Sequence, residues 1–317
     1  MDWQPSASLE MLQARAQLLA NIRKYFFQRQ VLEVETPLLG HATGSDRHIQ
    51  SWRVLSGLAA SGPPLYLQTS PEFAMKRLLC SGSGSIYQIT KAFRVEESSN
   101  THNPEFSMLE WYRLNFSLAD LMQEVEQLVC SVTGQPAIVR YTYREVFQTH
   151  LAIDPHVVST EDLEKITQKY IALVGEGLQR NDFLQLLLSV VIEPAISGSW
   201  FLTDYPKSQA ALAQIGIDEQ GTPVAQRFEL FCDGMEIANG YLELADPVEQ
   251  RRRFESDLAY RQKNTLEVYP IDEKLLAALD AGLPPCAGVA LGVDRLLMLV
   301  TGASRIDHVL NFITDQA

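Results

Sequence analysis

The stretch FRVEESSNTHNPEFSMLEWY, from Phe93 to Tyr112, decides the fold class. Strand-prone apolar and aromatic residues precede and end it, while its middle is polar and carries His102 and Asn103. We therefore expect two strands joined by a long loop. Such a hairpin suits a triphosphate, because arginine holds phosphate oxygens with paired donors and an aromatic ring stacks on a base. Taken in isolation, the stretch also fits an exposed hairpin with surface ion pairs.

A second segment, GVALGVDRLLMLVTG, covers Gly288 to Gly302 near the end of the chain. Gly288 and Gly292 flank a short apolar strand, and Asp294-Arg295 open an amphipathic helix. Glycines allow a backbone to approach a ligand closely, and Arg295 projects from the first helical turn. Two separated arginines, Arg94 and Arg295, could thus hold one nucleotide between them.

These two segments resemble motifs 2 and 3 of the class II aminoacyl-tRNA synthetases, and lysyl-tRNA synthetase most of all within that class. Three more blocks fit in the family's order: VLEVETPLL at 31–39 (motif 1), TSPEFAMKRLL at 69–79 and FELFCDGMEIANGYLEL at 228–244. Five ordered blocks over almost the whole chain make this a specific match. The resemblance implies an α+β fold with an antiparallel sheet flanked by helices, and a homodimer built through the motif 1 region.

The region before motif 1 is too short for an anticodon-binding barrel. Ser8 to Gln30 has the apolar spacing of one helix, and a five-stranded barrel cannot be made from it. The chain therefore resembles a free-standing catalytic domain, as in the elongation factor P lysine ligase family. We expect one domain over 1–317, with a helical insertion at about 137–195. The resemblance implies that lysine or (R)-β-lysine is activated with ATP and joined to a lysine of elongation factor P.

Bulk composition agrees with this interpretation but decides little. The net charge of −13 disfavours broad binding to nucleic acids, and tRNA is not an expected partner. No apolar run reaches membrane-spanning length and no secretory signal is visible, so we expect no membrane association and a cytoplasmic location. The four cysteines are scattered, which predicts reduced thiols and no structural zinc site.

The resemblance also implies an ATP site. Arg94 is the expected catalytic residue, because it would contact both the α-phosphate and the reacting carboxylate. Glu96 would contact the adenine amino edge, and Phe106 and Arg295 would stack on the two adenine faces. The full expected ATP-binding set is Arg94, Val95, Glu96, His102, Asn103, Phe106, Glu236, Ile237, Gly292 and Arg295. Glu229 and Glu236, on either side of an Asp233-Gly234 turn, would hold Mg²⁺ on the phosphates, because hard oxygen ligands suit that ion.

An amino-acid pocket for lysine needs carboxylates, because a buried ammonium without a partner is costly. Glu72 matches the position that receives the α-amine, while Glu243 and Tyr112 match positions at the far ammonium. The expected substrate set is Ser70, Pro71, Glu72, Glu110, Tyr112, Asn239, Glu243 and Ala290. Glu236 and Glu243 differ by an odd number, so we expect a bulge near residues 238–240 to turn both inward. Ala238 and Ala290 replace glycines usual in lysyl-tRNA synthetases and should reshape the pocket, as fits a β-amino isomer.

Three alternatives remain open at this point. Ammonia-dependent asparagine synthesis uses the same fold, but its acidic substrate needs a cation where Tyr112 and Glu243 provide acceptors. A catalytically silent paralogue that acts as a binding subunit tends to lose charged site residues, whereas Arg94, Glu229 and Arg295 are all present. The third alternative is a minimal enzyme that charges tRNA with lysine.

Overall fold

The computed structural model describes residues 3–55, 63–95, 99–172 and 177–316, and its chain forms two compact units. Unit 1 comprises residues 1–136 and 243–317, and unit 2 comprises residues 137–242. In the described ranges of both units, no helix combines the length and the apolar character needed to cross a bilayer. The expected single domain with an insertion at 137–195 stays a prediction.

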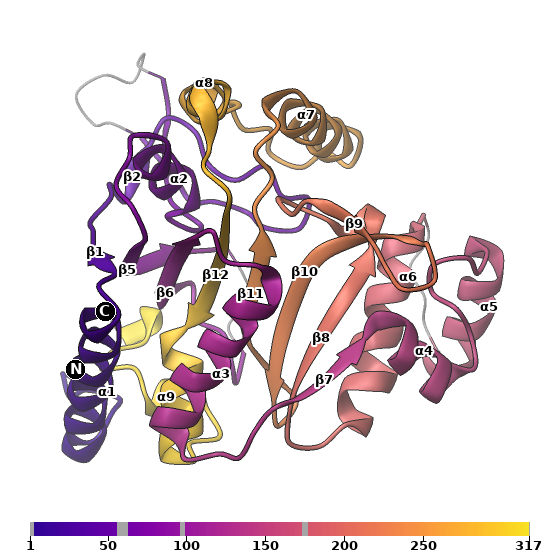
Figure 1. Ribbon diagram of the computed structural model, residues 1–317. Helices are drawn as coiled ribbons and strands as arrows, with labels where there is room; N and C mark the ends of the chain where they lie inside the picture. Colours follow the sequence, from indigo (N-terminus) through magenta and orange to yellow (C-terminus); the bar gives the residue numbers. More distant parts are fainter. Residues whose placement is uncertain (1–2, 56–62, 96–98, 173–176, 317) are drawn as a thin grey trace. The chain divides into compact units, whose positions relative to one another are not determined.

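Unit 1 is built on a mixed sheet in the order β1-β5-β6-β12 (Figure 1). Its strands are β1 (Leu32–Glu33), β5 (Ile86–Phe93), β6 (Glu105–Leu114) and β12 (Cys286–Gly292). The β5-β6 and β6-β12 pairs are antiparallel, and the β1-β5 pair at the edge is parallel. Three short strands, β2 (Leu39–Gly40), β3 (Arg53–Val54) and β4 (Leu65–Leu67), form a second sheet.

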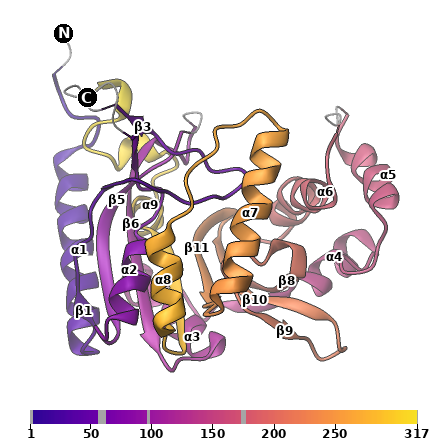
Figure 2. The ribbon, with the colours of Figure 1, turned by 90° about the horizontal axis from the view of Figure 1, so that it is seen from above.

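The helices of unit 1 form two groups. One group is α1 (Leu9–Gln28), α3 (Leu118–Thr133) and α9 (Val293–Thr301), which pack against one another, with α3 on β12 and α9 on β6 and β12 (Figure 1). The other group is α2 (Glu72–Cys80), α7 (Pro247–Lys263) and α8 (Glu273–Gly282), which lie side by side (Figure 2). Ser8, Ser117 and Asp246 are the N-caps of α1, α3 and α7, and each side chain accepts a backbone N–H of the first turn.

The strands of unit 2 pair in the order β11-β10-β8-β7, with β9 also paired to β10. Its strands are β7 (Val139–Thr142), β8 (Ser199–Pro206), β9 (Ile215–Ile217), β10 (Pro223–Cys232) and β11 (Met235–Leu242). The predicted β10-β11 hairpin is confirmed: Asp233 and Gly234 both have positive φ, 49° and 76°, as a tight turn of this kind requires. The β7-β8 pair is parallel and the other pairs are antiparallel.

Helices α4 (Tyr143–Leu151), α5 (Thr160–Tyr170) and α6 (Arg180–Leu187) are grouped in unit 2 (Figure 2). A capping box of Thr142 with Glu145 starts α4, and Ser159 and Gln179 are the N-caps of α5 and α6. Their apolar faces form one core with the strands; it includes Phe147, Leu184 and Trp200. The α+β class is therefore confirmed in each unit by itself.

Motif 1 forms only a short strand. The alternation of Leu32, Val34 and Thr36 with glutamates predicts a strand over residues 32–36, but β1 contains only Leu32 and Glu33. The Val34 N–H still donates to the Tyr87 carbonyl at 2.9 Å, and the backbone then leaves the ladder before Pro37. A proline has no N–H to donate, so pairing ends at this edge strand.

Candidate active site

Strands β6 and β12 bring several predicted pocket residues of unit 1 together. Ala290 lies opposite Glu110 and Gly288 lies opposite Tyr112 in the antiparallel register, so these four share one face of the sheet. A Cβ added to Gly288 would lie 2.4 Å from the Tyr112 ring and 2.5 Å from Glu243 Oε1. Gly288 was expected to admit a ligand, but its close neighbours are these protein side chains. Only glycine fits here without a shift.

Glu110 is held by two hydroxyl groups. The Tyr112 hydroxyl donates to its Oε1 at 2.6 Å, and the Ser70 hydroxyl donates to its Oε2 at 2.7 Å. Burial and the nearby charge of Glu72 raise the pKa of Glu110 to about 8, although these two hydrogen bonds act in the opposite direction. Burial also raises the pKa of Tyr112 well above its usual value. The buried carboxyl of Glu110 is therefore ready to bind a proton or a cation.

Ser70 also organises the start of α2. Its hydroxyl accepts the Glu72 N–H at 3.0 Å, although Pro71 and not Ser70 occupies the N-cap position. Pro71 is buried and Glu72 is half-buried in the first turn. The predicted Ser-Pro-Glu helix start is thus present one residue later than expected, and it places Glu72 beside the Glu110 carboxyl.

An internal ammonium joins two carboxylates of the pocket. Lys76 Nζ lies 2.6 Å from Glu72 Oε1 and 2.6 Å from Glu243 Oε2. Lys76 and Glu243 are 1% and 2% exposed, so this ion-paired group is shielded from water. Burial alone would lower the pKa of Lys76, but the two carboxylates outweigh it and raise that pKa. Burial raises the pKa of Glu243 to about 7, and Lys76 limits this rise.

Lys76 was not among the predicted site residues. Its four-residue spacing from Glu72 in one helix was a usable signal, since residues i and i+4 are neighbours on a helix surface. A second signal was its place beside Met75 and Leu79, which are buried. A buried lysine among apolar helix residues needs a carboxylate partner.

Most of the predicted nucleotide-binding residues of unit 1 lie in or beside the β5-β6 loop, whereas Gly292 and Arg295 lie at the end of β12 and the start of α9. The Arg94 guanidinium carbon lies 5.2 Å from the centre of the Phe106 ring, and Arg94 Nε donates to the Thr69 carbonyl at 3.4 Å. Both side chains are half-buried. Asn103 is buried and its amide donates to the Glu105 carbonyl at 2.6 Å. The structure thus brings Arg94 and Phe106 together, whereas Glu96 lies outside the described residues.

Arg295 contacts the same loop. Arg295 Nη2 lies 2.6 Å from His102 Nε2, and Arg295 Nε donates to the Thr101 carbonyl at 3.3 Å. A guanidinium only donates, so His102 Nε2 accepts and the proton of a neutral ring resides on Nδ1. His102 Nδ1 lies 2.8 Å from the Ser99 hydroxyl, which can accept that proton's hydrogen bond. Motif 3 and the motif 2 loop therefore meet through Arg295 and His102.

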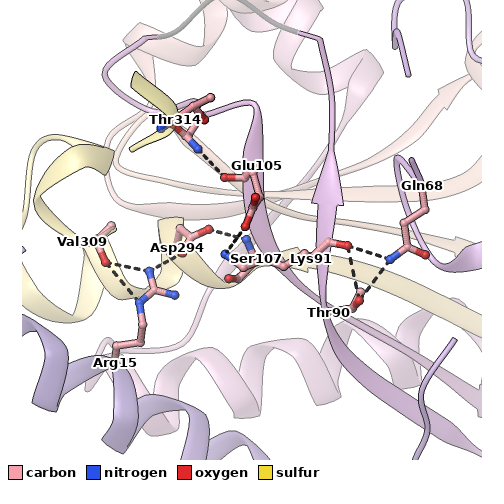
Figure 3. Close-up of polar contacts among 10 residues, drawn as sticks. Arg15, Gln68, Thr90, Lys91, Glu105, Ser107, Asp294, Val309 and Thr314 are labelled. Carbon is pink, nitrogen blue, oxygen red and sulfur yellow. Dashed lines mark hydrogen bonds and ion pairs between the residues drawn. The ribbon is translucent and has the colours of Figure 1, made fainter. Parts of the chain in front are cut away.

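The residue before Arg295 anchors the first turn of α9 (Figure 3). Asp294 is 2% exposed and pairs with Arg15 of α1, while its Oδ2 accepts the Ser107 N–H of β6 at 2.6 Å. Arg15 also donates to the Val309 carbonyl at 2.8 Å. Helix α1, strand β6 and the C-terminal segment thus meet at Asp294, which fixes the position of the neighbouring Arg295. Asp294 was expected only to open the helix. At Gly292, an added Cβ would lie 3.6 Å from the Arg295 side chain, an ordinary van der Waals contact.

Unit 2 holds the other predicted residues. Glu229 accepts from the Tyr205 hydroxyl at 2.6 Å and from Arg227, and Asn239 Nδ2 lies 3.4 Å from it. Glu229 pairs opposite Asn239, and Glu236 pairs opposite Phe231, two residues along β10. Directly opposite residues share a face, so the side chains of Glu229, Glu236 and Asn239 lie on the same face of this hairpin.

A β-bulge makes that shared face possible. The pairing jumps from Leu230–Ala238 to Phe231–Glu236, which leaves Ile237 as the extra residue of β11. Glu236 and Asn239 are separated by an odd number of residues and would otherwise face opposite sides. The expected bulge is present, one residue before the predicted range of 238–240.

The donors near Glu229 and Glu236 suit the chemistry of a magnesium ion. Burial and the charges of these two carboxylates raise the pKa of Glu193 to about 7, so a third carboxyl group lies close by. Two carboxylates are enough for Mg²⁺ when substrate phosphates and water supply its other oxygens. Within the described ranges, no group of three or more His, Cys, Asp or Glu side chains forms a ready metal cage. The donor set fits an ion shared with a nucleotide.

Comparison with known proteins gives one consistent family. Residues 1–316 match the family model of tRNA synthetases class II (D, K and N). The chain is 46% identical to the elongation factor P--(R)-beta-lysine ligase of Pseudoalteromonas translucida, over 98% of this chain and 97% of the relative. It is 47% identical to the protein of the same name from Vibrio parahaemolyticus, over 98% of each, and 43% identical to that of Haemophilus influenzae strain PittGG, over 99% and 98%.

Proposed function

Because the chain belongs to the class II tRNA synthetase family (D, K and N), and within it to the elongation factor P--(R)-beta-lysine ligases, we propose that it activates lysine or (R)-β-lysine with ATP and transfers it to a lysine side chain of elongation factor P. The observation that carries the proposal is a buried cluster in unit 1, in which one internal ammonium contacts Glu72 and Glu243 and the charge of Glu72 acts on a third carboxyl group, that of Glu110. Such a cluster favours a substrate with amino groups.

The first step joins two anions. A carboxylate oxygen of the amino acid attacks the α-phosphorus of ATP, the bond to the β-phosphate oxygen breaks, and pyrophosphate leaves. Arg94 would neutralise the reacting carboxylate and α-phosphate, and Phe106 and Arg295 would hold the adenine. His102, Asn103, Val95, Gly292 and Ile237 complete the proposed nucleotide set, together with Glu96. Glu229 and Glu236 would hold Mg²⁺, which would neutralise phosphate charge when bound.

The amino-acid side of the site is proposed from the pocket charges. Glu72, Glu110 and Glu243 would receive the ammonium groups, with Tyr112, Ser70, Pro71, Asn239 and Ala290 shaping their surroundings. In the second step a neutral amine of the acceptor lysine attacks the acyl carbon of the adenylate. The amide bond forms, AMP leaves, and the amine nitrogen releases a proton. The adenylate is already activated, so the enzyme needs no nucleophile of its own.

The acceptor is tested by transfer from a preformed adenylate. Radiolabelled (R)-β-lysine or lysine is first activated, excess ATP is removed, and elongation factor P or tRNA is added. We expect label in elongation factor P and none in tRNA. The matched control is elongation factor P whose acceptor lysine is changed to arginine, which should stay unlabelled. Label in tRNA without label in elongation factor P would contradict the proposal.

A homodimer is also proposed. Phe27 at the end of α1 is 82% exposed and Leu32 of β1 is 55% exposed, in the region that motif 1 occupies. Covering these apolar side chains with a second copy would remove them from water. Analytical ultracentrifugation should show that F27D weakens the dimer, whereas V248D, at an equally exposed valine of α7, should not. A monomeric wild-type protein would refute the dimer. The expected cytoplasmic location stays a prediction.

A further inference from the structure

Lys76 is a second charge centre inside the amino-acid pocket of unit 1. Its ammonium contacts Glu72 and Glu243 at the same distance, 2.6 Å, so those two carboxylate oxygens are no farther apart than twice that length. Both carboxylates belong to the set proposed to receive the substrate's ammonium groups. A protein lysine thus already occupies the carboxylates that are proposed to recognise a free lysine.

Among the described groups that most affect the pKa values of Lys76, Glu110 and Glu243, Lys76 itself is the one cation. Helix α2 contributes Glu72 and Cys80, strand β6 contributes Glu110 and Tyr112, strand β12 contributes Cys286, and Glu243 follows β11. When the three carboxyl groups are ionised, Lys76 compensates one of their three charges. Two negative charges then remain, which equals the number of ammonium groups on lysine or β-lysine.

We propose that Lys76 is a positioning residue that holds Glu72 and Glu243 together as carboxylates and sets the pocket's charge to match a diamino acid. The inference rests on the proposed function and specifies its substrate class. Without Lys76, three clustered carboxyl groups would repel one another and bind protons, because a like charge nearby disfavours ionisation. Protonated carboxyl groups would then pair poorly with the substrate's ammonium groups.

The pH dependence of substrate use separates this role from simple packing. Lys76 lowers the pKa of Glu243, which burial otherwise raises. In K76M that effect is lost, so Glu243 requires a higher pH to ionise. Loss of a close opposite charge shifts a carboxyl pKa upward by about one to three units. The KM for the diamino acid should therefore reach its low plateau at a correspondingly higher pH, while the KM for ATP should not move.

The experiment measures amino-acid-dependent pyrophosphate exchange between pH 6 and 9 for wild type, K76M and K76R, with lysine and (R)-β-lysine as probes. At pH 7 we expect K76M to raise the KM for the amino acid by about fivefold or more, because a rise of one unit from a pKa of about 7 lowers the ionised fraction of Glu243 from about one half to about one eleventh. K76R keeps the charge and should keep the pH profile, whatever its effect on KM itself. K91M, at an exposed lysine of β5, is the matched control for charge removal and should leave the profile unmoved.

Two results would overturn the inference. An unmoved pH profile in K76M would mean that Lys76 only fills space, and a lower KM would mean that it competes with the substrate. Should K76M fail to fold, the same comparison is made between E110Q and K76M/E110Q, because removing the Glu110 charge relieves the repulsion in the double variant. The KM for the amino acid must then reach its low plateau at a higher pH in K76M/E110Q than in E110Q. A wild-type protein that activates no diamino acid would refute the proposed function itself, which separates the two failures.

Discussion

The amino-acid pocket and the nucleotide-binding residues of unit 1 handle charge in different ways. In the pocket, Glu72, Lys76 and Glu243 are in contact with one another, and Glu110 is held by two hydroxyl groups. These groups are largely buried: Glu72 and Lys76 on α2, Glu110 on β6, and Glu243 directly after β11. The nucleotide residues Arg94 and Arg295 are half-buried, on a loop and on the first turn of α9.

The difference follows from what each ligand brings. A triphosphate carries several negative charges and remains partly in water, so cations at an accessible position suffice. An amino acid brings few charges, and its recognition depends on shielding them from water and matching them in number. In the pocket, part of the carboxylate charge is therefore already compensated by a protein ammonium. The charges of the nucleotide-binding arginines would be compensated by the phosphates of the ligand.

The largest expected effect concerns the cation on the nucleotide side. R94A should lower amino-acid-dependent pyrophosphate exchange by about 10³–10⁵-fold, the range for losing an arginine that stabilises charge in phosphoryl transfer. The thermal unfolding midpoint should stay close to that of wild type, because Arg94 is half-buried and leaves no core cavity. K91A removes an exposed lysine of the same hairpin and should keep exchange. Near wild-type exchange in R94A would assign the phosphate contact to another group.

On the pocket side, E243Q keeps the shape but removes a buried negative charge. Breaking a buried ion pair costs about 3–5 kcal/mol, and Glu243 also holds Lys76. We expect amino-acid use to fall by about 10²–10³-fold, while ATP affinity changes little. Isothermal titration with ATP and exchange kinetics with lysine make the comparison. Equal losses of ATP affinity and of amino-acid use would mean that Glu243 does not act specifically on the amino acid.

Local elements of the fold were predictable, because their signals lie within a few residues. Ser117 and Asp120 form the capping box that starts α3, and Asp233-Gly234 adopts the positive φ values that its hairpin turn needs. The resemblance named Glu72 and Glu243 as pocket residues. The resemblance identified each of these residues separately and did not predict the contacts between them.

Contacts between distant residues were not predictable from the local pattern. The Lys76–Glu243 pair joins α2 to a residue far along the chain, and Asp294 meets Arg15 and Ser107 only after three elements have packed. The bulge at Ile237 was expected in kind because of an odd residue spacing, but its position depends on how β10 and β11 pair. The odd residue spacing predicts that β11 contains a bulge, whereas the packing of the two strands decides the position of that bulge.

The pH dependence of binding sharpens the comparison. The pKa of Glu110 is raised to about 8 and that of Glu243 to about 7, so both carboxyl groups gain protons as the pH falls below these values. Only the ionised forms pair with an ammonium. As the pH rises from 6 to 8, the affinity for the amino acid should therefore increase by up to about tenfold per pH unit for each carboxyl group that loses a proton. Titration calorimetry in two buffers of different ionisation enthalpy should detect proton release on binding. E110Q should release fewer protons, and equal release would exclude Glu110.

Two glycines of β12, Gly288 and Gly292, allow the packing of the two regions to be compared directly. In G288A the new Cβ would lie 2.4 Å from the Tyr112 ring, and overpacking of this kind costs about 1–3 kcal/mol of unfolding free energy. In G292A the new Cβ would lie 3.6 Å from Arg295, with φ of −74°, so we expect a loss below about 1 kcal/mol. Urea unfolding measures both. Equal stability of the two variants would show that the pocket can expand around Gly288.

The smallest expected effect concerns the isomer of the substrate. Ala290 is half-buried opposite Glu110, so its methyl group lies on the strand pair that carries the pocket carboxyl. A290G removes that methyl and should relax discrimination between α-lysine and (R)-β-lysine. One methyl group in a pocket is worth about 1–3 kcal/mol, so the change in the ratio of the two kcat/KM values should be partial. A ratio equal to that of wild type would remove Ala290 from the specificity argument and leave Ala238 of unit 2 as the remaining departure from the lysyl-tRNA synthetase pattern.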